Sequence, residues 1–145
     1  MPRSRDPKHL FVYGTLREDS RHDMHRVLAR GSVFVGDGVV SGRLFDLGNY
    51  PGMARATDTQ QRVSGELYKL KAANAADVLR ILDDYEGLGP DDPLPYEYRR
   101  EVVNVRLNDG RMVPAWAYVL ADANPPFPRI PSEDYLSWRK HRDSA

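Results

Sequence analysis

The sequence predicts an α+β fold in which a small, mixed and mostly antiparallel β-sheet, curled toward a barrel, is flanked by helices. About six or seven segments have the composition of strands, and two or three have the periodicity of helices. The strand-like segments do not alternate regularly with the helical ones, which argues against a doubly wound parallel sheet. Two alternating runs on either side of "NDG" predict a hairpin, so at least part of the sheet is antiparallel.

The N-terminal half of the chain predicts a strand, a helix and two further strands. "KHLFVYG" is rich in aromatic and branched residues and stops at Gly14, which is typical of a strand. In "SRHDMHRVLARG", Ser20 precedes Asp23 by three positions, the spacing of a capping box at the start of a helix. "SVFVGDGVVSGRLFDLGNYPGM" then predicts two strands around residues 36–38, followed by a turn at Pro51–Gly52.

The clearest helix of the sequence is "NAADVLRILDDYEG". Asn74 can cap its first turn, and Gly87 can end it. Its apolar residues recur at i, i+3, i+4 and i+7, as one buried helix face requires: Val78, Ile81, Leu82 and Tyr85. The segment before it, "RVSGELYKL", alternates as a half-buried strand does.

The last third of the chain predicts a hairpin and a short helix. After the acidic, proline-rich loop "LGPDDPLP" come "EVVNVRL" and "MVPAWAYVL", joined by a bulge or by a loop longer than two residues. "PPFPRIPSEDYLSWRKHR" predicts a helix that Ser132 caps. We therefore expect a single domain over residues 1–145, with a core at about 8–121 and a C-terminal tail with a short helix at 122–145.

The composition limits the classes of function. Among 145 residues, 21 Lys and Arg balance 21 Asp and Glu, so no net charge attracts nucleic acid or acidic lipid. The absence of cysteine excludes a disulfide, a thiolate nucleophile and a thiolate metal site. No long apolar run predicts a membrane span. We expect a cytoplasmic protein that has no metal or other cofactor and binds neither nucleic acid nor membrane.

Three carboxylates crowd the end of the clearest helix: Asp83, Asp84 and Glu86. At about 100° per residue, only Glu86 can lean over the buried side, and the two aspartates are expected to face solvent. The helix dipole disfavours a negative charge in the last turn by roughly 0.3–1 kcal/mol. Neighbouring acids and partial burial act in the same direction and would raise the pKa of Glu86. The residues alone leave two interpretations open, a general acid/base or three solvated acids.

Other candidate site residues are weaker. "FVYGTLRE" places Gly14 at the end of a strand, where backbone N–H groups can bind an anion and Thr15 adds a hydroxyl; the alternative is a tight turn. His22 and His25 share a helix face but have no third ligand nearby, so no metal site is predicted. Four tyrosines are either core aromatics or hydroxyls that orient a ligand: Tyr85, Tyr96, Tyr98 and Tyr118.

Six segments in this order resemble the gamma-glutamylcyclotransferase-like superfamily, which includes gamma-glutamylamine cyclotransferases and AIG2-like proteins. They are "FVYGTLR", "GRLFDLGNYPGM", "VSGELYKL", "LDDYEG", "YRREVVNV" and "AWAYVL", and they cover about residues 10–120. The resemblance implies a small β-barrel flanked by helices, without a cofactor, as a monomer or homodimer. It also implies an enzyme that releases an amine or amino acid from a gamma-glutamyl compound and forms 5-oxoproline.

The resemblance assigns roles to particular residues. It implies that Glu86 is the general acid/base, that Tyr98 faces the pocket and that Tyr50 lies at its rim. The loop that would hold the gamma-glutamyl portion corresponds to Tyr13, Gly14, Thr15 and Leu16. The segment "GPDDPLPYE" is longer than in compact members, which is expected to change the leaving group that fits. Two alternatives are a binding module that uses this pocket without turnover, and a hydrolase or lyase acting on a different acyl-amine.

Overall fold

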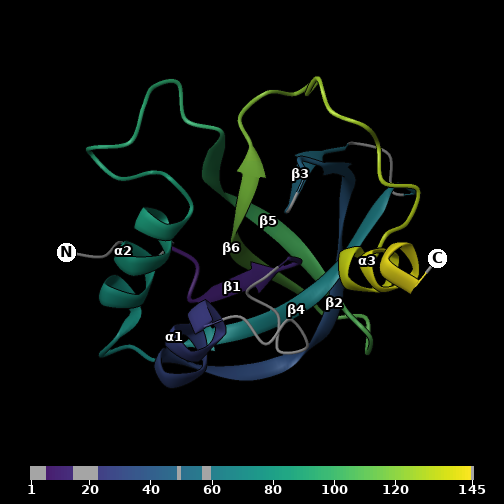
Figure 1. Cartoon of the computed structure of the whole chain (residues 1–145). Coiled ribbons are helices and arrows are strands. Elements are labelled where there is room, and N and C mark those ends of the chain that lie inside the picture. The colour runs from purple at the N-terminus through teal and green to yellow at the C-terminus, as the bar shows by residue number, and fades with distance from the viewer. Residues whose placement is uncertain (1–5, 15–22, 49, 57–59, 145) are drawn as a thin grey trace.

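The computed structural model describes residues 6–14, 23–48, 50–56 and 60–144 of the chain. Within these ranges it contains six strands and three helices (Figure 1). In chain order they are β1 (His9–Val12), α1 (Asp23–Gly31), β2 (Ser32–Asp46), β3 (Pro51–Arg55), β4 (Arg62–Leu70), α2 (Ala75–Tyr85), β5 (Tyr98–Leu107), β6 (Met112–Leu120) and α3 (Tyr135–Ser144). Ser20, predicted to start the capping box, lies outside the described ranges.

Five of the strands close into a barrel. They follow the order β2, β4, β1, β6 and β5, and β5 pairs again with β2. Only the β1–β6 pair is parallel among the described pairings, and β3 extends the sheet by pairing with β2. The predicted α+β class, with a mixed and mostly antiparallel barrel flanked by helices, is therefore confirmed. The predicted hairpin is also confirmed, because β5 and β6 pair antiparallel across the loop 108–111.

The strand predictions between β2 and β4 need three corrections. β2 is one strand of 15 residues rather than two; it has a register shift between Phe34 and Gly36 and pairs with β3, β4 and β5. Pro51 begins β3 instead of forming a turn, a position where proline costs no ladder hydrogen bond. β4 is not half-buried, because Glu66 and Tyr68 on its second face are only 5% and 3% exposed.

The helices lie on two sides of the barrel. Figure 1 shows α1 and α2 together on one side and α3 on the opposite side. Two groups of buried side chains meet at the barrel wall, and consecutive residues of β1 alternate between them: Phe11 packs with the barrel interior, and Leu10 packs with the helix residues Leu28 and Leu82. None of the helices in the described ranges is long and apolar enough to cross a membrane.

Of two predicted helix caps, Asn74 occupies the predicted position without a side-chain bond, and the prediction of Ser132 is wrong. Asn74 precedes α2, but its side chain makes no capping hydrogen bond. α3 begins after Asp134, whose carboxylate accepts the Ser137 N–H at 3.1 Å. Ser132 instead accepts the N–H of Asp134 at 3.1 Å and stabilises the turn before the helix. A serine and an aspartate two positions apart are equally good caps by sequence, and the path of the chain decides between them.

The predicted apolar face of α2 is narrower than its spacing indicates. Val78 and Leu82 are buried, whereas Ile81 and Tyr85 are 37% and 40% exposed. Tyr85 lines a cavity next to the end of the helix instead of packing in the core. The side of α2 that carries Val78 and Leu82 thus packs against the barrel, and the last residues of the helix border the cavity.

Candidate active site

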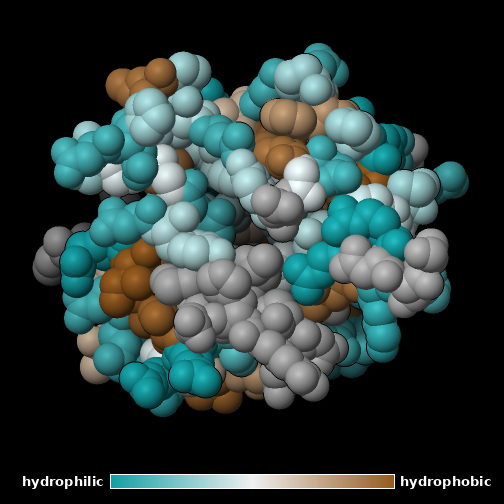
Figure 2. Space-filling model, viewed as in Figure 1, coloured by the Kyte–Doolittle hydropathy of each residue, from teal (hydrophilic) through white to brown (hydrophobic). Residues whose placement is uncertain are grey.

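A cavity of about 780 Å³ lies at one end of the barrel. It is bounded by the end of β1, the start of β3, the C-terminal end of α2, the loop before β5, and α3. Figure 2 shows that the molecular surface is hollowed near the centre of this face. The volume is in the range of small-molecule sites, roughly 300–1,000 Å³.

Glu86 reaches this cavity because the helix ends just before it. Its backbone is no longer in the helix proper, and Gly87 adopts the positive φ of +83° that favours glycine. The N–H of Leu88 donates to the Asp83 carbonyl at 2.9 Å, and the N–H of Gly87 donates to the Asp84 carbonyl at 3.2 Å. This pair of bonds is the Schellman pattern. The prediction that Gly87 ends the helix is confirmed, and Glu86 follows the last turn rather than lying within it.

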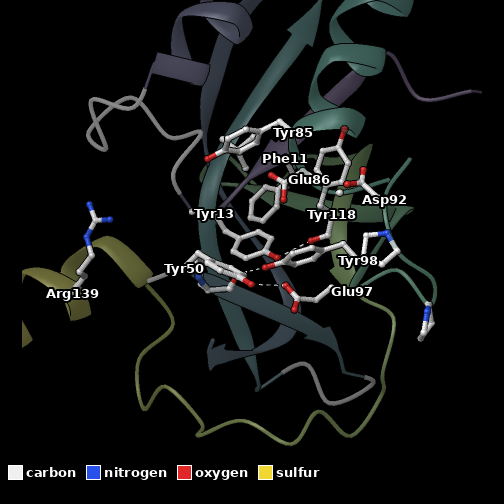
Figure 3. Close-up of a pocket in the computed structure, with 16 residues that line it drawn as sticks. Phe11, Tyr13, Tyr50, Tyr85, Glu86, Asp92, Glu97, Tyr98, Tyr118 and Arg139 are labelled. Atoms are coloured by element: carbon white, nitrogen blue, oxygen red, sulfur yellow. Dashed lines mark hydrogen bonds between the residues drawn. The ribbon is translucent and has the colours of Figure 1, made fainter. Parts of the chain in front are cut away.

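The Glu86 carboxyl is mostly buried and points toward the centre of a group of aromatic side chains (Figure 3). Burial raises its pKa from the ordinary value of 4.5 to about 7, and the charges of Asp83 and Glu97 add to the shift. The pKa of Glu86 is raised, as the sequence predicted, but the main cause is removal of the carboxyl from water and not the helix dipole. A carboxyl with this pKa can both take and return a proton near neutral pH.

The prediction that both aspartates of the cluster face solvent is half wrong. Asp84 is exposed. Asp83 is paired: Arg100 donates to it through Nε at 2.9 Å and through Nη2 at 3.3 Å, and the Tyr118 hydroxyl donates to it at 2.7 Å. Arg100 and Tyr118 lie opposite each other on β5 and β6. Helical spacing cannot reveal them, because they come from another part of the chain.

Two buried tyrosines hold the strands around the cavity together. The Tyr13 hydroxyl donates to the Tyr118 carbonyl at 2.7 Å and accepts the Met53 N–H at 3.0 Å. The Tyr98 hydroxyl donates to the Pro51 carbonyl at 2.6 Å. Burial raises the pKa of both hydroxyls well above its ordinary value, so both stay protonated.

The hydrogen bonds leave the cavity wall rich in acceptors. Four tyrosines that line it each donate their hydroxyl proton to a protein oxygen: Tyr13, Tyr50, Tyr98 and Tyr118. A hydroxyl whose proton is used in this way can still accept, but it cannot donate to a ligand. Together with the Glu86 and Glu97 carboxyls, these oxygens complement a group that carries several N–H donors, such as an ammonium.

The structure brings together every predicted site residue that it describes. Tyr13, Gly14, Tyr50, Glu86 and Tyr98 all line the cavity. Thr15 and Leu16 lie outside the described residues. Gly14 also lies against β3, where a Cβ atom on it would be 3.0 Å from the Pro51 side chain. Its lack of a side chain therefore permits the close approach of two cavity segments.

Sequence reasoning did not select three charged residues that also line the cavity: Asp92, Glu97 and Arg139. Asp92 accepts the Gly89 N–H at 2.8 Å, and Arg139 stands apart from the other labelled side chains on the α3 side (Figure 3). Both acids belong to the long segment "GPDDPLPYE", whose acidic composition was the available signal. Among the described side chains, no group of three or more His, Asp and Glu is placed to hold a metal ion.

Comparison with known proteins agrees with this fold. A family model described as gamma-glutamyl cyclotransferase, AIG2-like, matches residues 10–139. The fold is that of a cyclotransferase-like protein, and the chain belongs to the gamma-glutamyl cyclotransferase, AIG2-like family. A search of curated proteins found no match.

Solved structures with the same fold include an AIG2-like protein from Mus musculus, which is 28% identical with a TM-score of 0.67 and covers 88% of this chain and 87% of its own. YkqA from Bacillus subtilis is 23% identical with a TM-score of 0.70 over 97% of this chain, but this chain spans only 44% of its length. A gamma-glutamyl cyclotransferase is 14% identical with a TM-score of 0.54, covering 81% of this chain and 68% of its own. The last two likenesses show the fold alone.

Proposed function

We propose that this protein is a gamma-glutamyl cyclotransferase that releases an amine or amino acid from a gamma-glutamyl compound and forms 5-oxoproline, with Glu86 as the general acid/base. One observation carries the proposal: Glu86 is mostly buried in a cavity of substrate size, and its pKa is raised to about 7. The family membership supports the reaction class.

The reaction needs one group that moves a proton twice. The Glu86 carboxylate takes a proton from the α-ammonium of the gamma-glutamyl group, and the freed nitrogen attacks the side-chain carbonyl carbon of the same group. Glu86 then returns the proton to the leaving nitrogen as its bond to that carbon breaks. As the amide of the ring forms, its nitrogen loses a second proton, which passes to the released amine. The products are 5-oxoproline and the amine in its ammonium form, and Glu86 ends ionised as it began. General acid/base catalysis of this kind contributes roughly 10²–10⁴-fold.

The cavity wall supports the same chemistry. The acceptor oxygens of Tyr13, Tyr98 and Tyr118 complement the substrate's ammonium and leave its lone pair free once Glu86 has removed the proton. We assign the binding of the gamma-glutamyl portion to backbone groups of Gly14, Thr15 and Leu16, which would fold the substrate for ring closure and stabilise the developing negative charge. Tyr50, at the more exposed edge of the cavity, would contact the leaving group.

The test measures 5-oxoproline release from a panel of gamma-glutamyl amines, gamma-glutamyl dipeptides and glutathione. We expect at least one substrate to turn over, and we expect Glu86→Gln to lose at least about 100-fold in kcat with its fold intact. The matched control is Asp84→Asn, which removes an exposed acid from the same helix and should retain activity. Turnover that survives Glu86→Gln contradicts the assignment of the acid/base.

Binding measurements on the same panel separate the alternatives. A ligand that binds wild type and Glu86→Gln alike, with no product from any compound, indicates a binding module. Release of glutamate in place of 5-oxoproline indicates a hydrolase that admits water to the carbonyl carbon. Either outcome rejects the cyclotransferase proposal while leaving the fold unchanged.

A further inference from the structure

Asp83 lies one helical turn before Glu86, and its carboxylate joins the end of α2 to the barrel. Arg100 on β5 donates two hydrogen bonds to it, at 2.9 and 3.3 Å, and Tyr118 on β6 donates a third at 2.7 Å. The side chains of Asp83 and Arg100 are each 25% exposed, so this ion pair is better shielded than one on the open surface. Three charge-assisted hydrogen bonds to one carboxylate restrain it strongly.

Both partners of Asp83 are themselves fixed. The Arg100 guanidinium lies 4.4 Å from the centre of the Trp116 ring, which supports its other face. Tyr118 is buried, lines the cavity, and accepts the Tyr13 hydroxyl at its backbone carbonyl. The cluster of Asp83, Arg100, Trp116 and Tyr118, here called the α2 anchor, therefore connects the helix end with the wall of the cavity that Glu86 enters.

We propose that Asp83 is a positioning residue for Glu86: the α2 anchor fixes where the Glu86 carboxyl enters the cavity, and the balance of charge between Asp83 and Arg100 controls how readily Glu86 exchanges its proton. The inference rests on the proposed function for its catalytic meaning, because Glu86 is the acid/base there. Its physical content, a charge pair that acts on the protonation of Glu86, can be tested without substrate.

The two charges of the pair act on Glu86 in opposite directions. The negative charge of Asp83 raises the pKa of Glu86, and only burial has a larger effect. The positive charge of Arg100, which is bonded to Asp83, should offset part of that effect. The other titratable groups that line the cavity around Glu86 are Tyr85 on α2, Asp92 and Glu97 before β5, Tyr98 on β5, Tyr118 on β6, Tyr13 after β1, Tyr50 before β3 and Arg139 on α3.

Opposite shifts distinguish this role from a structural one. Asp83→Asn removes a negative charge and leaves Arg100 uncompensated, so the pKa of Glu86 should fall by about half a unit or more. Arg100→Gln leaves Asp83 uncompensated, so the pKa should rise by a similar amount. The double variant Asp83→Asn with Arg100→Gln should return it toward the wild-type value. An ion pair that only stabilised the fold would not shift the pKa of Glu86 in opposite directions in the two single variants.

The experiment titrates the full chain, labelled with ¹³C at the glutamate side-chain carboxyl, by NMR. The Glu86 signal is assigned from its absence in Glu86→Gln, and Asp84→Asn serves as the control for an exposed neighbour on the same helix. Opposite shifts in the two single variants support the inference. Shifts of the same sign, or none, overturn it. If one single variant fails to fold, the other single variant and the double variant still test the sign of the shift in the pKa of Glu86.

The activity readout separates this inference from the proposed function. With a turned-over substrate, the acid limb of the pH dependence of kcat/KM should move with the NMR titration in each variant. Opposite NMR shifts without 5-oxoproline from any compound support the charge coupling and reject the cyclotransferase. If the wild type turns over a substrate but neither variant shifts the acid limb or the NMR titration of Glu86, the cyclotransferase proposal is supported and the role of Asp83 is rejected.

Discussion

The Tyr50 hydroxyl donates a 2.8 Å hydrogen bond to the Glu97 carboxylate, 47 residues further along the chain. The bond joins the turn before β3 to the long loop before β5 across the cavity edge. Its acceptor is also one of the two carboxylates whose charge raises the pKa of Glu86. The proline-rich loop thus contributes a charge to the site as well as a boundary.

Glu97→Gln should lower the pKa of Glu86 from about 7, because it removes one of the neighbouring negative charges. The acid limb of the pH dependence of 5-oxoproline release should then move to lower pH. Glu101→Gln is the matched control: Glu101 lies on β5, pairs with Arg55 at 3.3 Å, and does not line the cavity. An acid limb that moves equally in both variants, or to higher pH in Glu97→Gln, contradicts the expectation.

The pKa of Glu86 also predicts how stability depends on pH. In the folded protein it is raised to about 7 from an ordinary value of 4.5, so folding favours the protonated acid. The stabilisation is complete below pH 4.5 and is lost as pH rises through about 7. Relative to Glu86→Gln, the wild type should therefore lose up to about 3 kcal/mol between these limits. Urea unfolding of both proteins at about pH 4 and about pH 8 measures the difference. Asp84→Asn should show no comparable change, and a difference that does not depend on pH refutes the shift.

Gly87 and Gly110 form a matched pair for testing the end of α2. Both have positive φ, +83° and +91°, and a Cβ atom on either would meet no neighbour within 4 Å. Alanine at either position should cost roughly 1–2 kcal/mol of unfolding free energy, because left-handed backbone is unfavourable for it. Only Gly87→Ala should also lower kcat, because it displaces the residue after Glu86, whereas Gly110 lies in the β5–β6 loop. Equal activity in the two variants would show that the helix end does not position the acid.

Leu82 and Ile81 test which side of α2 supports the site. Leu82 is fully buried, whereas Ile81 is 37% exposed. Leu82→Ala should cost about 2–5 kcal/mol through the cavity it creates, and Ile81→Ala about 1 kcal/mol or less. Chemical denaturation of the two variants measures both values. Similar losses at the two positions would indicate that the apolar face is as broad as its spacing suggests.

Local sequence distinguishes Glu86 from its two neighbouring acids, because the distinction depends on helix geometry and on a glycine; its role as acid/base is assigned only by the family resemblance. The spacing of apolar residues places Glu86 near the buried side of α2, and the positive φ of Gly87 requires a residue that tolerates it. The prediction that Asp83 faces solvent is wrong because its environment depends on residues far away in the sequence. Its partners Arg100 and Tyr118 are 17 and 35 residues away in the chain, and helical periodicity carries no information on what packs against a polar face.

The prediction of a turn at Pro51–Gly52 is also wrong, because the conformation there depends on pairing with another strand. "YPG" has the composition of a turn, yet Pro51 and Gly52 start β3. Pro51 already pairs with Asp46 of β2, and the Leu47 N–H donates to the Tyr50 carbonyl at 3.1 Å. Proline at the edge of a sheet satisfies the same local preferences as proline in a turn. Pairing with β2 decides between them, and pairing is not a local property.

By itself, the sequence determined most of the strands and helices and the end of α2, because each depends on residues within a few positions of one another. It left the role of Glu86 open, and the resemblance to a known family assigned that role. The tertiary structure alone decided what surrounds that acid. Closure of β2 onto β5 completes the barrel, and the packing of α2 beside it brings Asp83 to Arg100 and Tyr118. Hydrogen bonds and charges act through space, so the proton affinity of Glu86 depends on neighbours that the order of residues along the chain does not reveal.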